Sequence, residues 1–217
     1  MLGISLGKDR HRPLRLLCLG AHSDDIEIGC GGTILRLLAQ GAPVEACWVV
    51  FGARGPRAQE ARRSASLFLA GAHAQRVLVR NHRDGFFPIE GGTIKEEFEK
   101  LKRSFAPDVV LTHYRDDRHQ DHRVISDLTW NTFRDHLILE YEVPKYDGDL
   151  GIPNFFVPLD EETCMKKIGH ILDNFPSQRA KHWFTAETFR AMLRLRGIES
   201  CAPYAEAFHC RKIVMQD

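Results

Sequence analysis

The chain has 217 residues, of which 43% are hydrophobic and 27% charged, and its formal net charge is +1. This is typical of a globular protein with one sizeable core, and the interspersed basic and acidic side chains disfavour nucleic acid as a partner. Because no stretch approaches the roughly 20 apolar residues that cross a bilayer, and residues 1–12 lack the apolar segment of a secretory signal, we expect one cytoplasmic domain over residues 1–217 without a membrane span.

Apolar runs alternate with segments that carry leucines and other apolar residues at helical spacing. In chain order the expected elements are a strand at 14–19, a helix at 28–40, a strand at 44–51, a helix at 57–69, a strand at 76–79, a helix at 93–105, a strand at 109–112 and a helix at 121–133. Continuous apolar strands separated by helices predict an α/β fold, a Rossmann-like and mostly parallel sheet with helices on both faces.

The pattern changes after residue 133. A further strand is expected at 137–143, residues 146–158 are rich in glycine and proline, and helices are expected at 161–175 and 185–195. We interpret this part as a C-terminal elaboration over the active edge of the sheet and not as a second domain.

Two polar clusters directly follow the first and fourth predicted strands, at residues 21–27 and 113–122. Because ligands bind beyond the carboxyl ends of parallel strands, both clusters are expected at the same edge. His22 and Asp25 lie three residues apart, close enough to bind one metal ion, and His122 would complete the three protein ligands of a catalytic zinc site. Solvated loop residues and helix N-caps are the ordinary alternative for any one of these side chains, but not for both clusters together.

The remaining ionisable side chains suggest catalytic roles. Asp24 could accept the proton of a metal-activated water, as a general base. His119, if protonated, could stabilise the oxygen that gains charge when a carbonyl is attacked. Asp121 or Asp117 would keep it protonated, because a nearby carboxylate favours imidazolium.

The segments Ala-His-Ser-Asp-Asp-Ile-Glu-Ile-Gly-Cys-Gly-Gly-Thr (21–33) and Asp-Asp-Arg-His-Gln-Asp-His (116–122) resemble the two signature motifs of the PIG-L/LmbE family of zinc-dependent N-deacetylases. The resemblance implies the three-layer sandwich of that family and the removal of acetyl groups from N-acetylglucosaminyl compounds. It also implies zinc (Zn2+) ligands His22, Asp25 and His122, the base Asp24, and His119 as electrostatic partner supported by Asp121. Ser23 stands where the family usually has proline.

Weaker similarities to the family extend over most of the chain. They are Arg57 and Glu60, Lys166, Ser177-Gln178, and Tyr204 to Phe208.

Substrate contacts are expected from loops at the same edge of the sheet. Arg57 and Arg54 follow the second strand, and His82 and Asp84 follow the third. An arginine there could bind a phosphate or hydroxyl groups of the group attached to the sugar, although a solvated surface arginine is as common. The glycines at 29, 31 and 32 do not form GxGxxG, since position 34 is isoleucine, so no dinucleotide cofactor is expected; we interpret them as letting the loop fold around metal and sugar.

The sequence therefore predicts a zinc-dependent amidohydrolase whose partner is a small N-acetylated amino sugar or its conjugate. Two alternatives stay open. A non-haem iron enzyme would bind Fe2+ with the same two histidines and one carboxylate. A non-catalytic carbohydrate-binding module would keep the fold without the reaction. The aglycone of the sugar and a homo-oligomeric state are not determined by the sequence.

Overall fold

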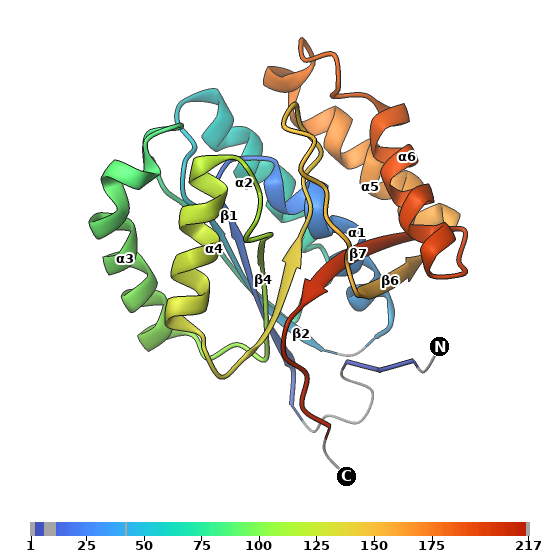
Figure 1. The fold of residues 1–217 in the computed structure, drawn as a ribbon, viewed down its shortest axis with the longest axis horizontal. Helices are drawn as coiled ribbons and strands as arrows, with labels where there is room; N and C mark the ends of the chain where they lie inside the picture. Colours follow the sequence, from blue (N-terminus) through green and yellow to red (C-terminus); the bar gives the residue numbers. More distant parts are fainter. Residues whose placement is uncertain (1–2, 7–11, 42, 216–217) are drawn as a thin grey trace.

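The computed structural model describes residues 3–6, 12–41 and 43–215 and contains a seven-stranded sheet with helices packed on its faces (Figure 1). The strand order is β3-β2-β1-β4-β5-β7-β6. Strands β1 to β5 pair in parallel, and β7 runs antiparallel to both β5 and β6. In the described part of the chain, no helix is both long and apolar enough to cross a membrane.

The strands and helices alternate through the first two thirds of the chain. The strands are β1 (Leu14–Gly20), β2 (Val44–Val50), β3 (Ala74–Val79), β4 (Val109–His113), β5 (Leu137–Tyr141), β6 (Phe155–Leu159) and β7 (Tyr204–Cys210). The helices are α1 (Asp25–Ala39), α2 (Pro56–Phe68), α3 (Phe87–Ser104), α4 (Gln120–Thr132), α5 (Glu161–Asn174) and α6 (Ala186–Glu199).

Successive side chains of each central strand enter two separate cores. On β1, Leu16 and Cys18 join the core under α1, α2 and α5, whereas Leu17 and Leu19 join the core under α3 and α4. Because successive side chains point to opposite faces of a strand, both must be apolar when helices cover both faces. This is why β1, β2 and β4 read as continuous apolar runs in the sequence.

Only part of the C-terminal region lies over the active edge of the sheet, where the sequence analysis expected the whole of it. Helix α5 packs on α1 and α2, and α6 packs on β7, so these helices extend the layer on one face of the sheet instead of covering its active edge. Strands β6 and β7, which the sequence pattern did not predict, widen the sheet with antiparallel pairs. The parts of this region that reach the active edge are residues 143–147, Lys181 and Trp183.

Candidate metal centre and catalytic pocket

The two polar clusters meet at the carboxyl ends of the neighbouring strands β1 and β4. His22 lies in the loop after β1, Asp24 is the N-cap of α1, and Asp25 is the first residue of that helix. His119 is the N-cap of α4, and His122 lies in its first turn. Because β1 and β4 pair directly and in parallel, their carboxyl ends bring both loops together, as the sequence predicts.

The side chains of His22, Asp25 and His122 form a compact triangle of potential ligand atoms. His22 Nδ1 lies 3.3 Å from His122 Nε2 and 3.5 Å from Asp25 Oδ2, and His122 Nε2 lies 3.6 Å from the same oxygen. Metal bonds of about 2.0–2.2 Å in a tetrahedral arrangement place neighbouring ligand atoms about 3.4 Å apart. The triangle therefore fits a small divalent cation with one position open toward the pocket.

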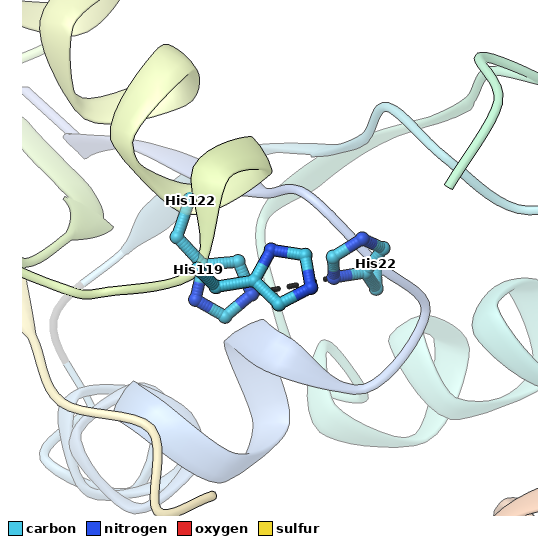
Figure 2. A group of neighbouring side chains, drawn as sticks. All are labelled: His22, His119 and His122. Atoms are coloured by element: carbon cyan, nitrogen blue, oxygen red, sulfur yellow. Dashed lines mark hydrogen bonds between the residues drawn. The ribbon is translucent and has the colours of Figure 1, made fainter. Parts of the chain in front are cut away.

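Figure 2 shows His22 facing the two histidines of the α4 segment, with His119 beside His122. One ring nitrogen each of His22, His119 and His122 also lies within 4.8 Å of the other two, which makes these histidines another potential ligand group. His22 forms another such group with Asp84 and Asp121, and Asp25 and His122 form one with His113.

Each of the two ligand histidines has a carboxylate on its other ring nitrogen. His22 Nε2 lies 3.1 Å from Oδ2 of Asp121, and His122 Nδ1 lies 2.9 Å from Oδ2 of Asp117. A carboxylate in this position accepts the N–H of the imidazole and leaves the opposite nitrogen unprotonated and directed at a metal. Asp117 is itself held by Lys145 Nζ at 2.9 Å.

This arrangement corrects the role expected for Asp121. Its carboxylate accepts hydrogen bonds from the backbone N–H groups of Gly85 and Phe87 and contacts His22. Its charge also raises the pKa of His119, as expected, but burial and the charge of His22 outweigh this effect. Only the backbone N–H of Asp121 reaches His119, and it donates to Nδ1 at 3.2 Å. The carboxylate thus supports a ligand histidine instead of holding His119 protonated.

His119 is consequently a neutral hydrogen-bond donor. Because Nδ1 accepts the Asp121 amide, the ring proton resides on Nε2. Burial, followed by the charge of His22, lowers the pKa of His119, which also favours the neutral imidazole. The ring lines the pocket, so its Nε2–H can donate to a developing oxyanion without the imidazolium that the sequence suggested.

His113, at the end of β4, is fully buried and stacks on the ring of His122 with centroids 3.9 Å apart. Its Nε2 accepts the backbone N–H of Ala21 at 2.9 Å and lies 3.2 Å from Oδ2 of Asp25, so in this arrangement its lone pair is already used within the protein. Burial lowers the pKa of His113 to about 4, which keeps it neutral. His113 therefore packs behind the ligands and helps to fix the loop after β1.

The two adjacent acids Asp24 and Asp25 are both buried, yet their pKa values move in opposite directions. Burial, and then the charge of Asp25, raises the pKa of Asp24. Burial would also raise the pKa of Asp25, but the nearby histidines, with His122 first, outweigh it and hold that pKa well below its usual range. Asp25 is thus a permanent anion that is suited to bind a cation. Asp24, whose pKa is raised, is the acid better suited to accept a proton.

A pocket of about 220 Å³ opens above these residues, and Arg57 and Asp84 line it as predicted. Arg57 Nε donates to Ser23 Oγ at 3.1 Å, and its NH1 lies 3.2 Å from Asp84 Oδ2. The predicted contacts Arg54 and His82 do not line the pocket. Arg54 donates to the carbonyl of Asn81, and His82 lies between Glu90 and Glu97.

The pocket wall also includes residues that the sequence pattern did not identify as substrate contacts. They are Lys145, Tyr146, Asp147 and Lys181. Trp183 lines the pocket as well. The Lys181 ammonium lies over its ring, 5.4 Å from the centroid.

The motif glycines on α1 serve helix packing instead of loop conformation. A Cβ on Gly29 would lie 2.1 Å from Cδ2 of Tyr141, and one on Gly31 would lie 2.5 Å from Cε1 of Phe68. Both glycines are inside α1, and neither has a positive φ. Gly29 brings the first turns of α1 close to Tyr141 of the sheet, and Gly31 brings them close to Phe68 of α2, which sets the position of Asp25.

Residues 17–133 match the family model described as PIG-L: GlcNAc-PI de-N-acetylase. The chain is 31% identical over 141 residues to the uncharacterized deacetylase YaiS of Escherichia coli (strain K12), covering 60% of this chain and 74% of the relative. The solved N,N'-diacetylchitobiose deacetylase of Pyrococcus horikoshii has a TM-score of 0.64 at 21% identity, covering 91% of this chain and 83% of the other. GalB, the 4-carboxy-2-hydroxymuconate hydratase of Pseudomonas putida KT2440, has a TM-score of 0.69 at 18% identity, covering 94% of this chain and 98% of the other. These structures confirm the predicted α/β fold, and at such identities they show the fold alone.

Proposed function

We propose that this chain, which belongs to the PIG-L family and is a hydrolytic deacetylase, removes the acetyl group of an N-acetylated amino sugar or its conjugate with the help of a divalent metal ion. The family description and the YaiS relative support deacetylation, and the name of the Pyrococcus horikoshii enzyme supports an amino sugar as the substrate. We infer zinc as the metal, because two histidines and one carboxylate form a common catalytic zinc set.

The observation that carries this proposal is the pairing of each ligand histidine with a buried carboxylate. Asp121 behind His22 and Asp117 behind His122 direct the free ring nitrogens to the position that Asp25 also faces. Zinc, when bound there, supplies Lewis acidity that polarises the amide carbonyl and makes water more acidic.

The residues of this chain supply the proton transfers. Asp24 accepts the proton of the attacking water as the water oxygen bonds to the amide carbon. The Nε2–H of His119 donates to the carbonyl oxygen as it gains negative charge. When the carbon–nitrogen bond breaks, Asp24 returns the proton to the leaving nitrogen, so that acetate and a free amine are the products. Arg57, which lies 3.5 Å from Asp24 Oδ1, favours the ionised form of the base.

The proposal predicts that metal binding and turnover separate in two variants. Asp24→Ala should retain zinc while acetate release falls by about 10²- to 10⁴-fold, since Asp24 acts only on protons. His22→Ala should lose the metal. The exposed Asp127 on α4 provides the matched control, because Asp127→Ala removes an acid remote from the pocket and should release acetate normally.

The measurements are metal content by elemental analysis and acetate release from a panel of N-acetylated sugars and conjugates. Normal turnover by Asp24→Ala would refute its role as base, and no release from any substrate by the zinc-loaded protein would refute the deacetylase proposal. The iron alternative predicts copurified iron and oxygen consumption, and the absence of both would eliminate it.

A further inference from the structure

A second cavity lies beside the catalytic pocket and is lined by three arginines. It is a groove of about 490 Å³ formed by the loop after β2, the first turns of α2 and the end of β3. Its lining residues are Ala53, Arg54, Gly55, Ala58, Arg62, Val79, Arg80 and Asn81. Among the described residues that form this lining there is no carboxylate, in contrast to the catalytic pocket.

The three guanidinium groups keep most of their hydrogen-bonding capacity. Arg54 uses Nε to donate to the Asn81 carbonyl at 2.6 Å, and Arg80 uses Nε to bind Glu97 at 2.7 Å. Within the part of the chain that the structure describes, the Arg62 guanidinium has no hydrogen-bond or ion-pair partner. Glu97 is the carboxylate that pairs directly with one of these three arginines, and Glu90 is close enough for the charge of Arg54 to lower its pKa, so positive charge is still in excess and outer N–H groups remain free for an anion.

The positive end of α2 adds to this field. Helix α2 has 13 residues, its N-cap is Gly55 without a side-chain hydrogen bond, and its first turn contains no acidic residue. Gly55 and Ala58 of this turn belong to the groove lining. The partial positive charge of a helix N-terminus and the guanidinium groups thus act on the same space.

The groove and the catalytic pocket share the first turn of α2. Arg57 extends from that turn to Ser23 and Asp84 in the pocket, whereas Arg54 and Arg62 line the groove. A ligand that reached around this turn would place one end beside Asp24 and another among the arginines.

We propose that this groove binds phosphate groups. Bidentate contacts to phosphate oxygens are the typical use of clustered arginines, and the groove offers them without competing carboxylates in its lining. The phosphate comes either from the aglycone of the substrate, in which case the inference rests on the proposed function, or from a free phosphorylated ligand that occupies the groove alone.

The first test uses inorganic tripolyphosphate, titrated into the protein by calorimetry. Arg62→Gln should weaken binding about fivefold, the loss of one partly exposed charge pair, and the affinity should fall with added salt. Arg63→Gln is the matched control. Arg63 is the next residue of the same helix and is also exposed, but its NH2 donates to the Asp173 carbonyl at 3.1 Å instead of lining the groove. Equal affinities of the two variants, or no binding by the wild type, would overturn the proposal.

A second test separates the two sources of phosphate. With the zinc-loaded enzyme, a nucleoside-diphosphate-linked N-acetylglucosamine is compared with its neutral methyl glycoside. An aglycone site predicts that Arg62→Gln raises the KM ratio of the charged to the neutral substrate about fivefold, while kcat for the charged substrate is retained. A site for a free ligand predicts that Arg62→Gln leaves this KM ratio unchanged. It also predicts that added tripolyphosphate changes the KM of the wild-type enzyme for the neutral substrate. No acetate release from either substrate would contradict the proposed function, whereas the tripolyphosphate titration decides the groove by itself.

Discussion

Replacing Asp121 by asparagine tests whether the carboxylate behind His22 sets the metal affinity of the site. Asp121 Oδ2 lies 3.1 Å from His22 Nε2 and fixes the proton on that nitrogen, which leaves Nδ1 directed at Asp25 and His122. The Asp121 side chain is fully buried, so solvent cannot replace its charge. Losses of such outer carboxylates typically weaken metal binding about 10- to 100-fold.

The expected loss of metal affinity corresponds to about 1.4–2.7 kcal/mol. The same carboxylate also accepts the backbone N–H of Gly85 at 2.6 Å and that of Phe87 at 3.1 Å. Asparagine keeps one acceptor oxygen, so one buried donor loses its partner and the metal-free protein should lose about 1–3 kcal/mol of unfolding free energy. The two effects are measured apart, by zinc competition with a chromogenic chelator and by urea unfolding of the metal-free protein.

Asp84 provides the control for this prediction. Its Oδ1 also lies 3.1 Å from His22 Nε2, but its side chain is 55% exposed. Water screens an exposed carboxylate, so Asp84→Asn should change zinc affinity by less than about threefold. If Asp121→Asn bound zinc as tightly as Asp84→Asn, the role assigned to the buried carboxylate would be refuted.

Two further substitutions test packing and acid stability. Gly29→Ala places a Cβ 2.1 Å from the buried Tyr141 ring and should lower the free energy of unfolding by about 1–3 kcal/mol. Gly169→Ala, whose Cβ would have no atom within 4 Å, should raise it by about 0.5–1 kcal/mol. Urea unfolding that gave both changes the same sign would contradict this. Burial, followed by the charge of Arg196, lowers the pKa of His209 from 6.5 to about 4. The unfolded chain therefore binds a proton here at a higher pH than the folded protein does. The free energy of unfolding is unaffected above pH 6.5 and falls by up to about 3 kcal/mol as the pH drops toward 4. Unfolding of His209→Gln should therefore depend less steeply on pH between 6.5 and 4.5, and an unchanged dependence would show that His209 is not responsible.

The sequence determined the central sheet well, because a strand buried on both faces leaves an unmistakable apolar run. The predicted strands at 14–19, 44–51 and 109–112 agree with β1, β2 and β4 to within a residue or two. Helix α3 begins at Phe87, six residues before its predicted start at 93. Two adjacent glycines, Gly91 and Gly92, oppose a helix there, but burial of Phe87 and Ile94 outweighs that local preference.

The strands β6 and β7 escaped prediction for a different reason. Residues 155–159 of β6 are mostly half-buried and include Pro158, which is tolerated because β6 is an edge strand. Strand β7 contains the buried Glu206, whose carboxylate accepts the backbone N–H groups of Gly32 and Thr33 and binds Lys167. No apolar pattern indicates such a strand, since its polar residue is satisfied by partners far away in the sequence.

In the site, spacing identified which residues converge but not which atoms face each other. Asp121 is two residues from His119, and that proximity suggested a pair. On a helix, however, residues two apart do not share a face, and the Asp121 carboxylate instead reaches His22 from the other loop. The assignment of a carboxylate to a histidine depends on how β1 and β4 are aligned, which the sequence does not encode locally.

The charges enclosed at the sheet edge explain why these residues lie together. The buried carboxylates at the site are Asp24, Asp25, Asp117 and Asp121. Two cations, Arg57 and Lys145, contact this group. Burial lowers the pKa of His122 to about 3, so it adds no compensating proton near neutral pH. The four carboxylates thus outnumber these two cations by two, in a region that excludes most water, and the remaining negative charge is left for a protonated His22 or a bound cation to compensate. Buried charges of this kind are costly unless they are paired, and a dication at the His22, Asp25 and His122 triangle would neutralise them.

The same carboxylates raise the pKa of His22 well above its ordinary value against the opposing effect of burial, because Asp25, Asp121 and Asp84 surround the ring. A proton and a metal ion therefore compete for the same His22 nitrogen, and the carboxylates that orient the ligand also supply the charge that attracts the cation.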